Sequence, residues 1–439
     1  MRANIGEDNM PLLASLLHAL RGLPARALAI QLIAALPLAL LLLFAVSLLP
    51  QQPLREHLTQ AQQSGDLVNY PEYLGFREID MYTECIGMGV ATQMQPSLES
   101  LAAMRHFGQC EGLNTALEQG LQGQGSPYAR YVHGYQLALK PLYTLFPLMQ
   151  ARLFTAIAGL GLLLLLYMAA RLRIGEAYAA ALSASFLFAG TLHVFLLSTH
   201  APQFWVVLVG GIAAFICRRN TPALLFCGIG LADAFVSFLN MGSLSLGLPL
   251  LCFCLAAWAD GRKAQDILGS ALVCCACWSV GLLWLWLAKW GFAHLVLPPE
   301  TNLLGHTVQG YTATGPLMIL HALFNNLWNS LYWLWLPLFA LAGYRFVKRG
   351  LHIPPDLWVL ALPALVPFLW MCLIPGQSGV KHASFVSIII WPLLAAVFML
   401  LLALPRPAPR PRPCWRTWLG LAPKPTQQAN PAQPPQEQD

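Results

Sequence analysis

The residues best suited to chemistry gather in one segment, residues 70–90, which reads YPEYLGFREIDMYTECIGMGV. Asp80 and Glu84 lie four positions apart, and a helix over 79–90 would place both carboxylates on one face. Two carboxylates on one face suit proton transfer, because one can act as the base while the other shifts its pKa or holds a hydrogen bond. Glu78 is a third candidate base. The alternative is a solvated loop with ordinary surface charges.

Several cations and aromatic groups could bind a phosphate or a sugar near these carboxylates. The segment 126–143 (SPYARYVHGYQLALKPLY) is rich in both kinds of residue. The segment could form a helix in the membrane interface, with its cations directed toward a phosphate group. It could equally form an aromatic belt that only anchors the chain at the depth of the lipid headgroups. An isolated lysine beside a membrane usually extends to lipid headgroups. The candidate phosphate- and donor-binding residues are Arg77, Arg130, His133, Tyr135, Lys140, Lys289 and Lys381; the candidate sugar or acceptor contacts are Tyr82, Tyr128, His306 and Asn325.

Two of the 11 cysteines, Cys85 and Cys110, lie in the long hydrophilic segment 50–150. The others lie in or beside apolar segments or in the tail, and they resemble small buried hydrophobes. On an oxidising side of a membrane the two could form a disulfide. Closing a loop of about 25 residues would contribute roughly 3–4 kcal/mol in the chain-entropy model. Two unpaired thiols are the alternative.

These groups must be positioned by helices that cross a membrane. Hydrophobic residues make up 57% of the 439 residues and charged residues 10%, whereas a soluble domain carries about 25% charged residues. A run of about 20 apolar residues spans a hydrocarbon layer roughly 30 Å thick. About ten such runs are predicted, at 27–49, 151–170, 177–197, 202–217, 222–239, 243–259, 267–290, 328–344, 356–374 and 382–403.

Basic residues fix the orientation of these runs. Placing the N-terminus inside gives every short inside loop at least a pair of positive charges, such as Arg171 and Arg173, as the positive-inside rule requires. Both termini are then cytoplasmic, and two larger loops, 50–150 and 291–327, face outside. Asp233 falls within an apolar run, where an ionisable group suggests a function by default or a pairing with a neighbouring helix.

The expected fold class is therefore all-α, a polytopic membrane protein with about ten transmembrane helices and two larger extracytoplasmic loops. Residues 1–330 hold the first seven predicted helices with both larger loops, and residues 331–403 hold the C-terminal helices. The tail 404–439 is rich in Pro, Gln and Arg and is expected to be disordered. The chain has no Walker A loop, dinucleotide-binding glycines, HExxH or GxSxG, so nucleotide-driven and serine-hydrolase mechanisms are not expected.

A large outside loop after the first helix and another after the seventh resemble the layout of the GT-C glycosyltransferases. That resemblance covers residues 27–330 by topology, and it implies that residues 1–330 form one transmembrane module to which residues 331–403 add variable C-terminal helices. It implies a polyprenyl-phosphate-linked sugar as donor and an acidic residue of the first outside loop as base, with Asp80 the best match and Glu84 the next. The segment STHAPQ, between the third and fourth helices, lacks the second acidic motif frequent in the family. No metal and no other cofactor are expected.

The length, the spans and the acidic first loop are also similar to those members of the family that transfer arabinofuranose to type IV pilins. This narrower similarity implies a Ser or Thr hydroxyl of a pilin, or a glycan, as acceptor. It places the chain in a bacterial inner membrane with its active site facing the periplasm, in contact with membrane lipid and without a nucleic-acid partner. The alternatives are a transporter or flippase of a lipid-linked substrate and a non-catalytic envelope assembly factor.

Overall fold

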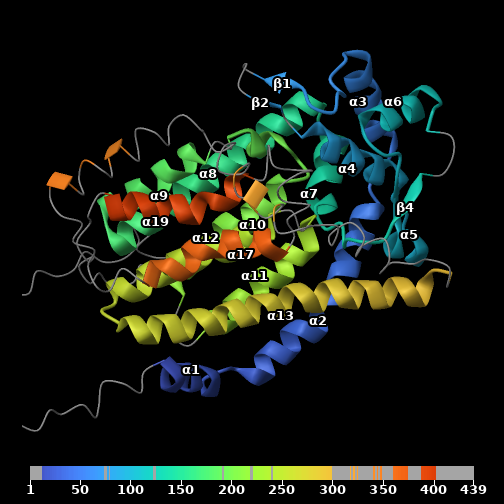
Figure 1. The fold of residues 1–439 in the computed structure, drawn as a ribbon. Coiled ribbons are helices and arrows are strands. Elements are labelled where there is room, and N and C mark those ends of the chain that lie inside the picture. The colour runs from blue at the N-terminus through green and yellow to red at the C-terminus, as the bar shows by residue number, and fades with distance from the viewer. Residues whose placement is uncertain are drawn as a thin grey trace, which may run out of the picture.

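The structure is a computed structural model. It describes residues 12–73, 77–78, 80–121, 125–189, 192–217, 221–238 and 241–298, short pieces between 317 and 348, and residues 359–373 and 387–401. The described chain is almost entirely helical, with four strands of two or three residues (Figure 1). This agrees with the expected all-α class.

Four of the described helices are long and apolar enough to cross a membrane, judged by length and composition. Shorter apolar helices pack among them. The long helices are α2 (Ala25–Ser47), α8 (Leu148–Ile174), α12 (Gly242–Ala259) and α13 (Ala264–Val296), and the shorter ones are α9 (Glu176–Phe188), α10 (Ala201–Ile216), α11 (Pro222–Val236), α17 (Ala361–Leu373) and α19 (Trp391–Leu401).

The segment between α2 and α8 folds into a compact unit at one end of the bundle, which we call the cap (residues 50–147) (Figure 1). Only the second half of the expected interfacial helix over 126–143 is helical. The cap contains α3 (Gln52–Gln63), α4 (Met81–Gln93), α5 (Leu98–Ala102), α6 (Cys110–Glu118) and α7 (Gln136–Leu145), with the antiparallel strand pairs β1 (Glu72–Tyr73) with β2 (Arg77–Glu78) and β3 (Met104–His106) with β4 (Ser126–Tyr128).

The helix α13 connects the two ends of the molecule. Its 33 residues correspond to about 50 Å at 1.5 Å per residue, well beyond a hydrocarbon layer of roughly 30 Å. The excess length lets its C-terminal part rise beside the cap and contact α5, while its first turns lie at the opposite end next to α1 (Leu12–Arg21), a helix that the sequence analysis did not predict (Figure 1).

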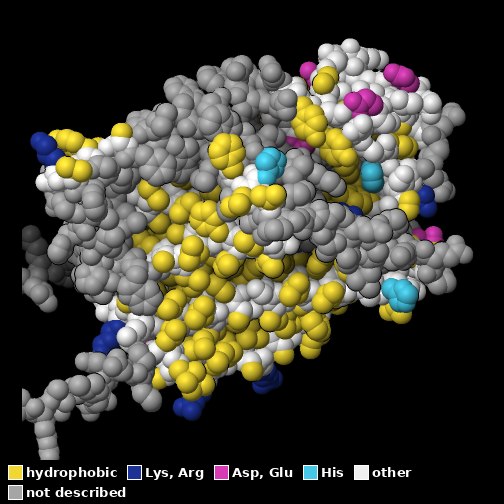
Figure 2. Space-filling view, viewed as in Figure 1, with side chains coloured by type: hydrophobic (Ala, Val, Ile, Leu, Met, Phe, Trp, Pro, Cys, Tyr) yellow, Lys and Arg dark blue, Asp and Glu magenta, His cyan; other side chains and the backbone are white. Residues whose placement is uncertain are grey.

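The end opposite the cap, the basal end, carries the short basic connections. Arg171 pairs with Glu176 between α8 and α9, and Arg173 pairs with Asp260 after α12. Lys and Arg side chains border the apolar surface of the molecule at this end (Figure 2). The structure thus separates the cap from the basic connections, as the charge pattern of the sequence indicates.

Glycines allow α11 and α13 to approach each other closely in the centre of the bundle. A Cβ at Gly230 would lie 2.1 Å from the carbonyl oxygen of Trp278, and one at Gly281 would lie 2.3 Å from that of Cys227. Both distances are far below van der Waals contact. Small residues at such crossings give helix pairs in membranes their packing energy.

Replacing Gly281 with alanine should destabilise this crossing, because the new Cβ would overlap the backbone of α11. Overpacking of this kind costs about 1–3 kcal/mol, which would lower the unfolding temperature of the detergent-purified protein. Gly291→Ala is the matched control, since Gly291 lies in the same helix with open space beside it; alanine there should be neutral or stabilising. Equal unfolding temperatures for the two variants would contradict the packing argument.

Candidate functional site

Asp80 is held at the start of α4 with both carboxylate oxygens occupied. Its Oδ1 accepts a hydrogen bond from the backbone N–H of Thr83 at 3.1 Å, which caps the helix and makes it begin at Met81 rather than at residue 79. Its Oδ2 lies 3.1 Å from Nε2 of His200, in the turn before α10. Both side chains are buried. The result is a desolvated carboxylate–imidazole pair between the cap and the bundle.

Glu84 faces the same turn but has a different set of partners. Its carboxylate accepts hydrogen bonds from the Tyr143 hydroxyl (2.8 Å), from the backbone N–H groups of Ser198 and Thr199 (2.9 Å each) and from the Thr199 hydroxyl. The side chain is fully buried. Four hydrogen-bond donors already occupy the Glu84 carboxylate, so Glu84 is suited to hold the turn at residues 198–200 in place. Asp80 is suited to proton transfer, because its partner is an imidazole.

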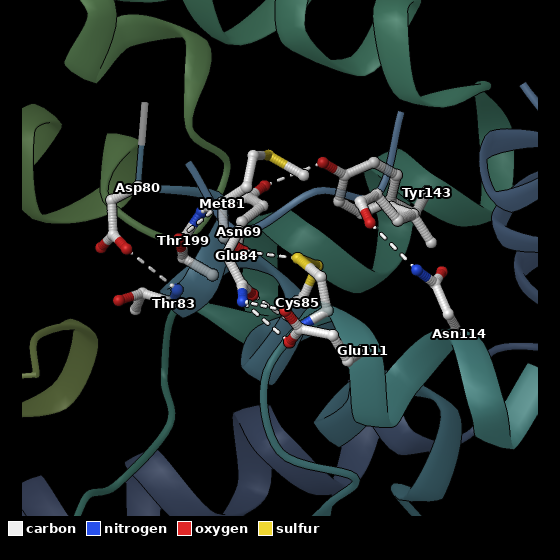
Figure 3. Close-up of a disulfide and its surroundings, with 12 residues drawn as sticks. Asn69, Asp80, Met81, Thr83, Glu84, Cys85, Glu111, Asn114, Tyr143 and Thr199 are labelled. Atoms are coloured by element: carbon white, nitrogen blue, oxygen red, sulfur yellow. Dashed lines mark hydrogen bonds between the residues drawn. A yellow bond between two sulfur atoms is a disulfide. The ribbon is translucent and has the colours of Figure 1, made fainter. Parts of the chain in front are cut away.

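A disulfide fixes the start of α4 beside these carboxylates (Figure 3). It joins Cys85, in the first turns of α4, to Cys110, at the start of α6. Asn69 reinforces the connection, because its side chain accepts a hydrogen bond from the backbone N–H of Cys110 at 3.0 Å and donates to the Glu111 carboxylate. The backbone carbonyl oxygen of Asn69 also accepts a hydrogen bond from the backbone N–H of Tyr82. The carboxylates therefore project from a firmly held helix.

His133 and its two tyrosine neighbours form a buried aromatic cluster rather than an anion-binding pocket. His133 has a φ of +65°; its Nε2 lies 2.7 Å from the carbonyl oxygen of Tyr128 and its Nδ1 lies 3.0 Å from the Tyr135 hydroxyl. Burial lowers the pKa of His133 to about 3 and raises the pKa of Tyr135. The imidazole is therefore neutral near pH 7 and supplies no charge to a phosphate.

The lysines expected near a phosphate instead tie the cap to the bundle. Lys140 is buried and donates to the carbonyl oxygen of Ser47 at 3.1 Å, and burial lowers its pKa to about 8. Lys289 is also buried and donates to the carbonyl oxygens of Leu101 (2.9 Å) and Ala102 (2.5 Å). It does not extend to lipid headgroups, because the end of α5 covers it.

The remaining predicted binding residues are dispersed. Arg130 is half-buried, with its guanidinium 5.8 Å from the centre of the Tyr131 ring. Tyr128 packs edge-on against Tyr131, and Tyr82 stacks on Tyr70. Only the backbone of Arg77 and Glu78 is described, as part of β2. The predicted residues that lie outside the described part of the chain are His306, Asn325 and Lys381.

An apolar groove of about 1000 Å³ runs between α7, α10 and α11. Pro202, two residues after His200, lines it near the cap, and Ala213 and Leu224 line it toward the basal end. Nearly all of its lining is hydrocarbon. The side chains of Gln31 and Trp205 add polar atoms.

Three buried polar residues, His200, Arg152 and Gln203, have contacts that the sequence did not predict. His200 lies in the short STHAPQ segment, whose four polar residues between two apolar stretches are its only sequence signal. Arg152, at the start of α8, is buried near Met81 and Tyr143. Gln203 donates to Asp233 at 2.9 Å, so the carboxyl group within the apolar run is paired with a neighbouring helix.

Among the described residues, no three His, Cys, Asp or Glu side chains are grouped closely enough to hold a metal ion. No family model, curated protein or solved structure matches the chain. The chemistry of the site therefore has to be argued from its own residues.

Glu84→Gln should destabilise the protein, because an amide cannot accept from all four donors and turns its own N–H groups toward some of them. Hydrogen bonds to charged groups contribute about 1.5–3 kcal/mol each, so a loss of roughly 2–4 kcal/mol is expected. Thermal unfolding in detergent measures the change. Glu99→Gln is the control, since Glu99 is an exposed glutamate of the cap and should change stability by less than about 0.5 kcal/mol.

Acidification should destabilise the cap through His133. Its pKa is about 3 in the folded protein and about 6.5 in the unfolded chain. At a pH between these two pKa values, the unfolded state binds more protons than the folded state. The free energy of unfolding therefore decreases as the pH falls below about 6.5, by up to roughly 1.4 kcal/mol per pH unit. His133→Asn, which tolerates the positive φ, should flatten the dependence of the unfolding temperature on pH between 7 and 5. An unchanged slope would show that His133 is not responsible.

Proposed function

We propose that this chain is a multispan inner-membrane glycosyltransferase that moves a sugar from a polyprenyl-phosphate donor to an acceptor hydroxyl on the periplasmic side. The observation that supports this proposal is a buried carboxylate–imidazole pair, Asp80 and His200, together with a long apolar groove that is lined by Pro202, two residues after His200. Proton-transfer groups next to a lipid-sized groove suit a substrate that is reactive at its head and hydrocarbon in its tail.

The groove supports a lipid-linked donor. Its volume of about 1000 Å³ and its apolar lining favour a hydrocarbon chain, since burial of apolar surface contributes about 25 cal/mol per Å². A sugar attached to a lipid phosphate is already activated, so no nucleotide is required. With the prenyl chain in the groove, the phosphate and sugar of the donor would lie near Pro202 and the turn that contains His200.

The Asp80–His200 pair is suited to remove a proton from the acceptor hydroxyl. When Asp80 accepts from Nε2–H of His200, the neutral ring carries its lone pair on Nδ1, so the pair can take up one proton as a unit. General-base catalysis of this kind contributes typically 10²–10⁴-fold to the rate. Glu84 supports the pair by holding the two residues that precede His200.

The departing phosphate requires a cation whose side chain is not fully buried. Lys140 and Lys289 are unsuited, because both donate to backbone carbonyls in buried positions. Arg130 is half-buried and is the stronger choice among the described residues. Arg77 and Lys381 remain predicted phosphate ligands. Arginine suits this role because its planar group binds two phosphate oxygens at once.

Two features support placing the cap in the periplasm. The Cys85–Cys110 disulfide would persist in an oxidising compartment and not in a reducing cytoplasm. The basic connections at the opposite end fit the cytoplasmic side of a membrane. The resemblance to GT-C enzymes, and the narrower similarity to those acting on type IV pilins, suggest arabinofuranose as the sugar and a pilin Ser or Thr, or a glycan, as acceptor.

A second candidate function is the movement of a lipid-linked substrate across the membrane. The groove favours it, because its lining extends from Pro202 near the cap to Leu224 toward the basal end. In that case the chain would translocate the lipid without breaking the sugar–phosphate bond. Accumulation of intact substrate in vesicles would distinguish this function from transfer.

Sugar transfer by detergent-purified protein from a panel of polyprenyl-phosphate sugars tests the proposal. Asp80→Asn should reduce transfer by about 10²-fold or more, because an amide cannot accept the proton or orient His200 in the same way. Asp66→Asn, in a half-exposed aspartate of the same cap, is the matched control and should keep full activity. Unfolding temperatures would verify that both variants are folded.

Full activity in Asp80→Asn would remove this carboxylate as part of the base. A wild-type protein that transfers no sugar from any donor, with pilin and glycan acceptors supplied, would contradict the proposed function.

A further inference from the structure

A buried polar cluster, which we call the Asp233 site, lies where α10, α11 and α12 meet. Asp233, in α11, and Gln203, in α10, are both buried, and the Gln203 side chain donates to Oδ1 of Asp233 at 2.9 Å. Gly242, the first residue of α12, lies against the other carboxylate oxygen, since a Cβ there would be 3.4 Å from Oδ2. The sequence neighbours Pro202 and Ala232 line the apolar groove, so the site lies behind the wall of the groove.

Two buried oxygen atoms of this site accept no hydrogen bond within the described part of the chain. They are Oδ2 of Asp233 and Oε1 of Gln203. Exchanging the oxygen and nitrogen of the Gln203 amide would not help, because the amide oxygen would then face Oδ1, another acceptor. The Ser245 hydroxyl lies near the carboxylate but donates to the carbonyl oxygen of Gly242 at 2.9 Å and accepts from the Trp278 indole at 3.0 Å. The two unpaired oxygens are therefore suited to bind a ligand.

The charge of Asp233 also lacks a basic partner among the described residues. The ion pairs of the described chain involve the carboxylates of Asp80, Glu176 and Asp260 instead. Hydrogen bonds from neutral groups such as the Gln203 amide stabilise a negative charge but do not balance it. A carboxylate among apolar helices is costly unless a cation or a proton neutralises it. A water molecule could donate to both unpaired oxygens but would leave the charge uncompensated.

We propose that the Asp233 site binds an alkali metal cation, sodium or potassium, with Oδ2 of Asp233 and Oε1 of Gln203 as ligands. Hard cations prefer oxygen ligands from carboxylate, amide and hydroxyl groups. A single positive charge balances the single carboxylate, whereas a divalent ion would leave a buried positive charge uncompensated. Among the described residues, no three His, Cys, Asp or Glu side chains are grouped as a transition metal would require.

The cation joins α10 to α11 close to the Asp80–His200 pair. Gln203 follows His200 by three residues, about one helical turn, so a cation on Gln203 stabilises the start of α10. His200 contacts Asp80 from this position. The site is independent of the proposed transfer reaction, because cation binding can be measured without donor or acceptor.

Thermal unfolding of the purified full chain tests the site in sodium chloride, potassium chloride and choline chloride at equal ionic strength. A cation at about a hundred times its dissociation constant raises the ratio of folded to unfolded protein about a hundredfold. The unfolding temperature in sodium or potassium chloride should therefore exceed that in choline chloride by roughly 3–5 °C. Radiolabelled sodium or potassium should bind with a stoichiometry of one ion per chain.

Three variants locate the effect. Asp233→Asn keeps the shape of the side chain and can still accept from Gln203, so it should fold, bind no cation and unfold at the same temperature in all three salts. Gln203→Met removes the amide ligand and should weaken cation binding by at least about tenfold. Asp66→Asn, in a half-exposed aspartate of the cap, is the charge-matched control and should keep the response of the wild type.

Equal unfolding temperatures of the wild type in the three salts, with no bound radiolabel, would overturn the cation and leave a proton as the group that neutralises Asp233. A difference between salts that persists in Asp233→Asn would overturn the location of the site. If Asp233→Asn failed to fold, unchanged cation binding in Gln203→Met would overturn the ligand assignment.

Discussion

The interface between the cap and the bundle depends on one constraint, the burial of the Glu84 carboxylate. A charged oxygen away from water is costly unless donors surround it. Here the donors come from α7 of the cap and from the turn that precedes α10 in the bundle. The cap and the bundle must therefore meet in one relative position for the charge to be satisfied. His200, which follows the bonded turn, is brought to Asp80 as a result.

Two buried lysines stabilise the same interface, because each donates hydrogen bonds to carbonyl groups across it. The last carbonyl groups of a helix lack partners within the helix and carry partial negative charge. Lys140 donates to such a carbonyl at the end of α2, and Lys289 donates to two at the end of α5. Each lysine thus joins one helix of the cap to one helix of the bundle. Removing either cation would leave helix-end carbonyls buried between cap and bundle without a donor.

Hydropathy predicted the helices of the bundle because each apolar run is a local property of the chain. The runs at 243–259 and 267–290 correspond to α12 (Gly242–Ala259) and α13 (Ala264–Val296). The runs at 356–374 and 382–403 contain α17 (Ala361–Leu373) and α19 (Trp391–Leu401), whereas the run at 328–344 lies largely outside the described residues. The total of ten spans stays a prediction. The helix α1 was not predicted, because its leucines precede the first long apolar run and form a stripe too short to span a membrane.

The site was predictable only where neighbouring residues define it. The spacing of Asp80 and Glu84 indicated two carboxylates on one side of a helix. Their different roles depend on a turn more than a hundred residues away, which local spacing cannot reveal. Lys140 and Lys289 were predicted to bind phosphate because they are cations near the expected membrane interface, and extension to lipid headgroups was the alternative for Lys289. The carbonyl groups that they bind instead are brought close only by the folded cap.

The disulfide between Cys85 and Cys110 has a consequence for the biogenesis of the protein. Both cysteines belong to the segment between α2 and α8, so in the proposed topology this segment crosses the membrane before an oxidising environment can join them. The turn that completes the carboxylate cluster is synthesised later, with the helices that follow α8. A chain inserted in the wrong orientation would keep these thiols reduced on the cytoplasmic side. In the proposed topology, correct insertion and assembly of the site are therefore linked through the redox state of one pair of sulfur atoms.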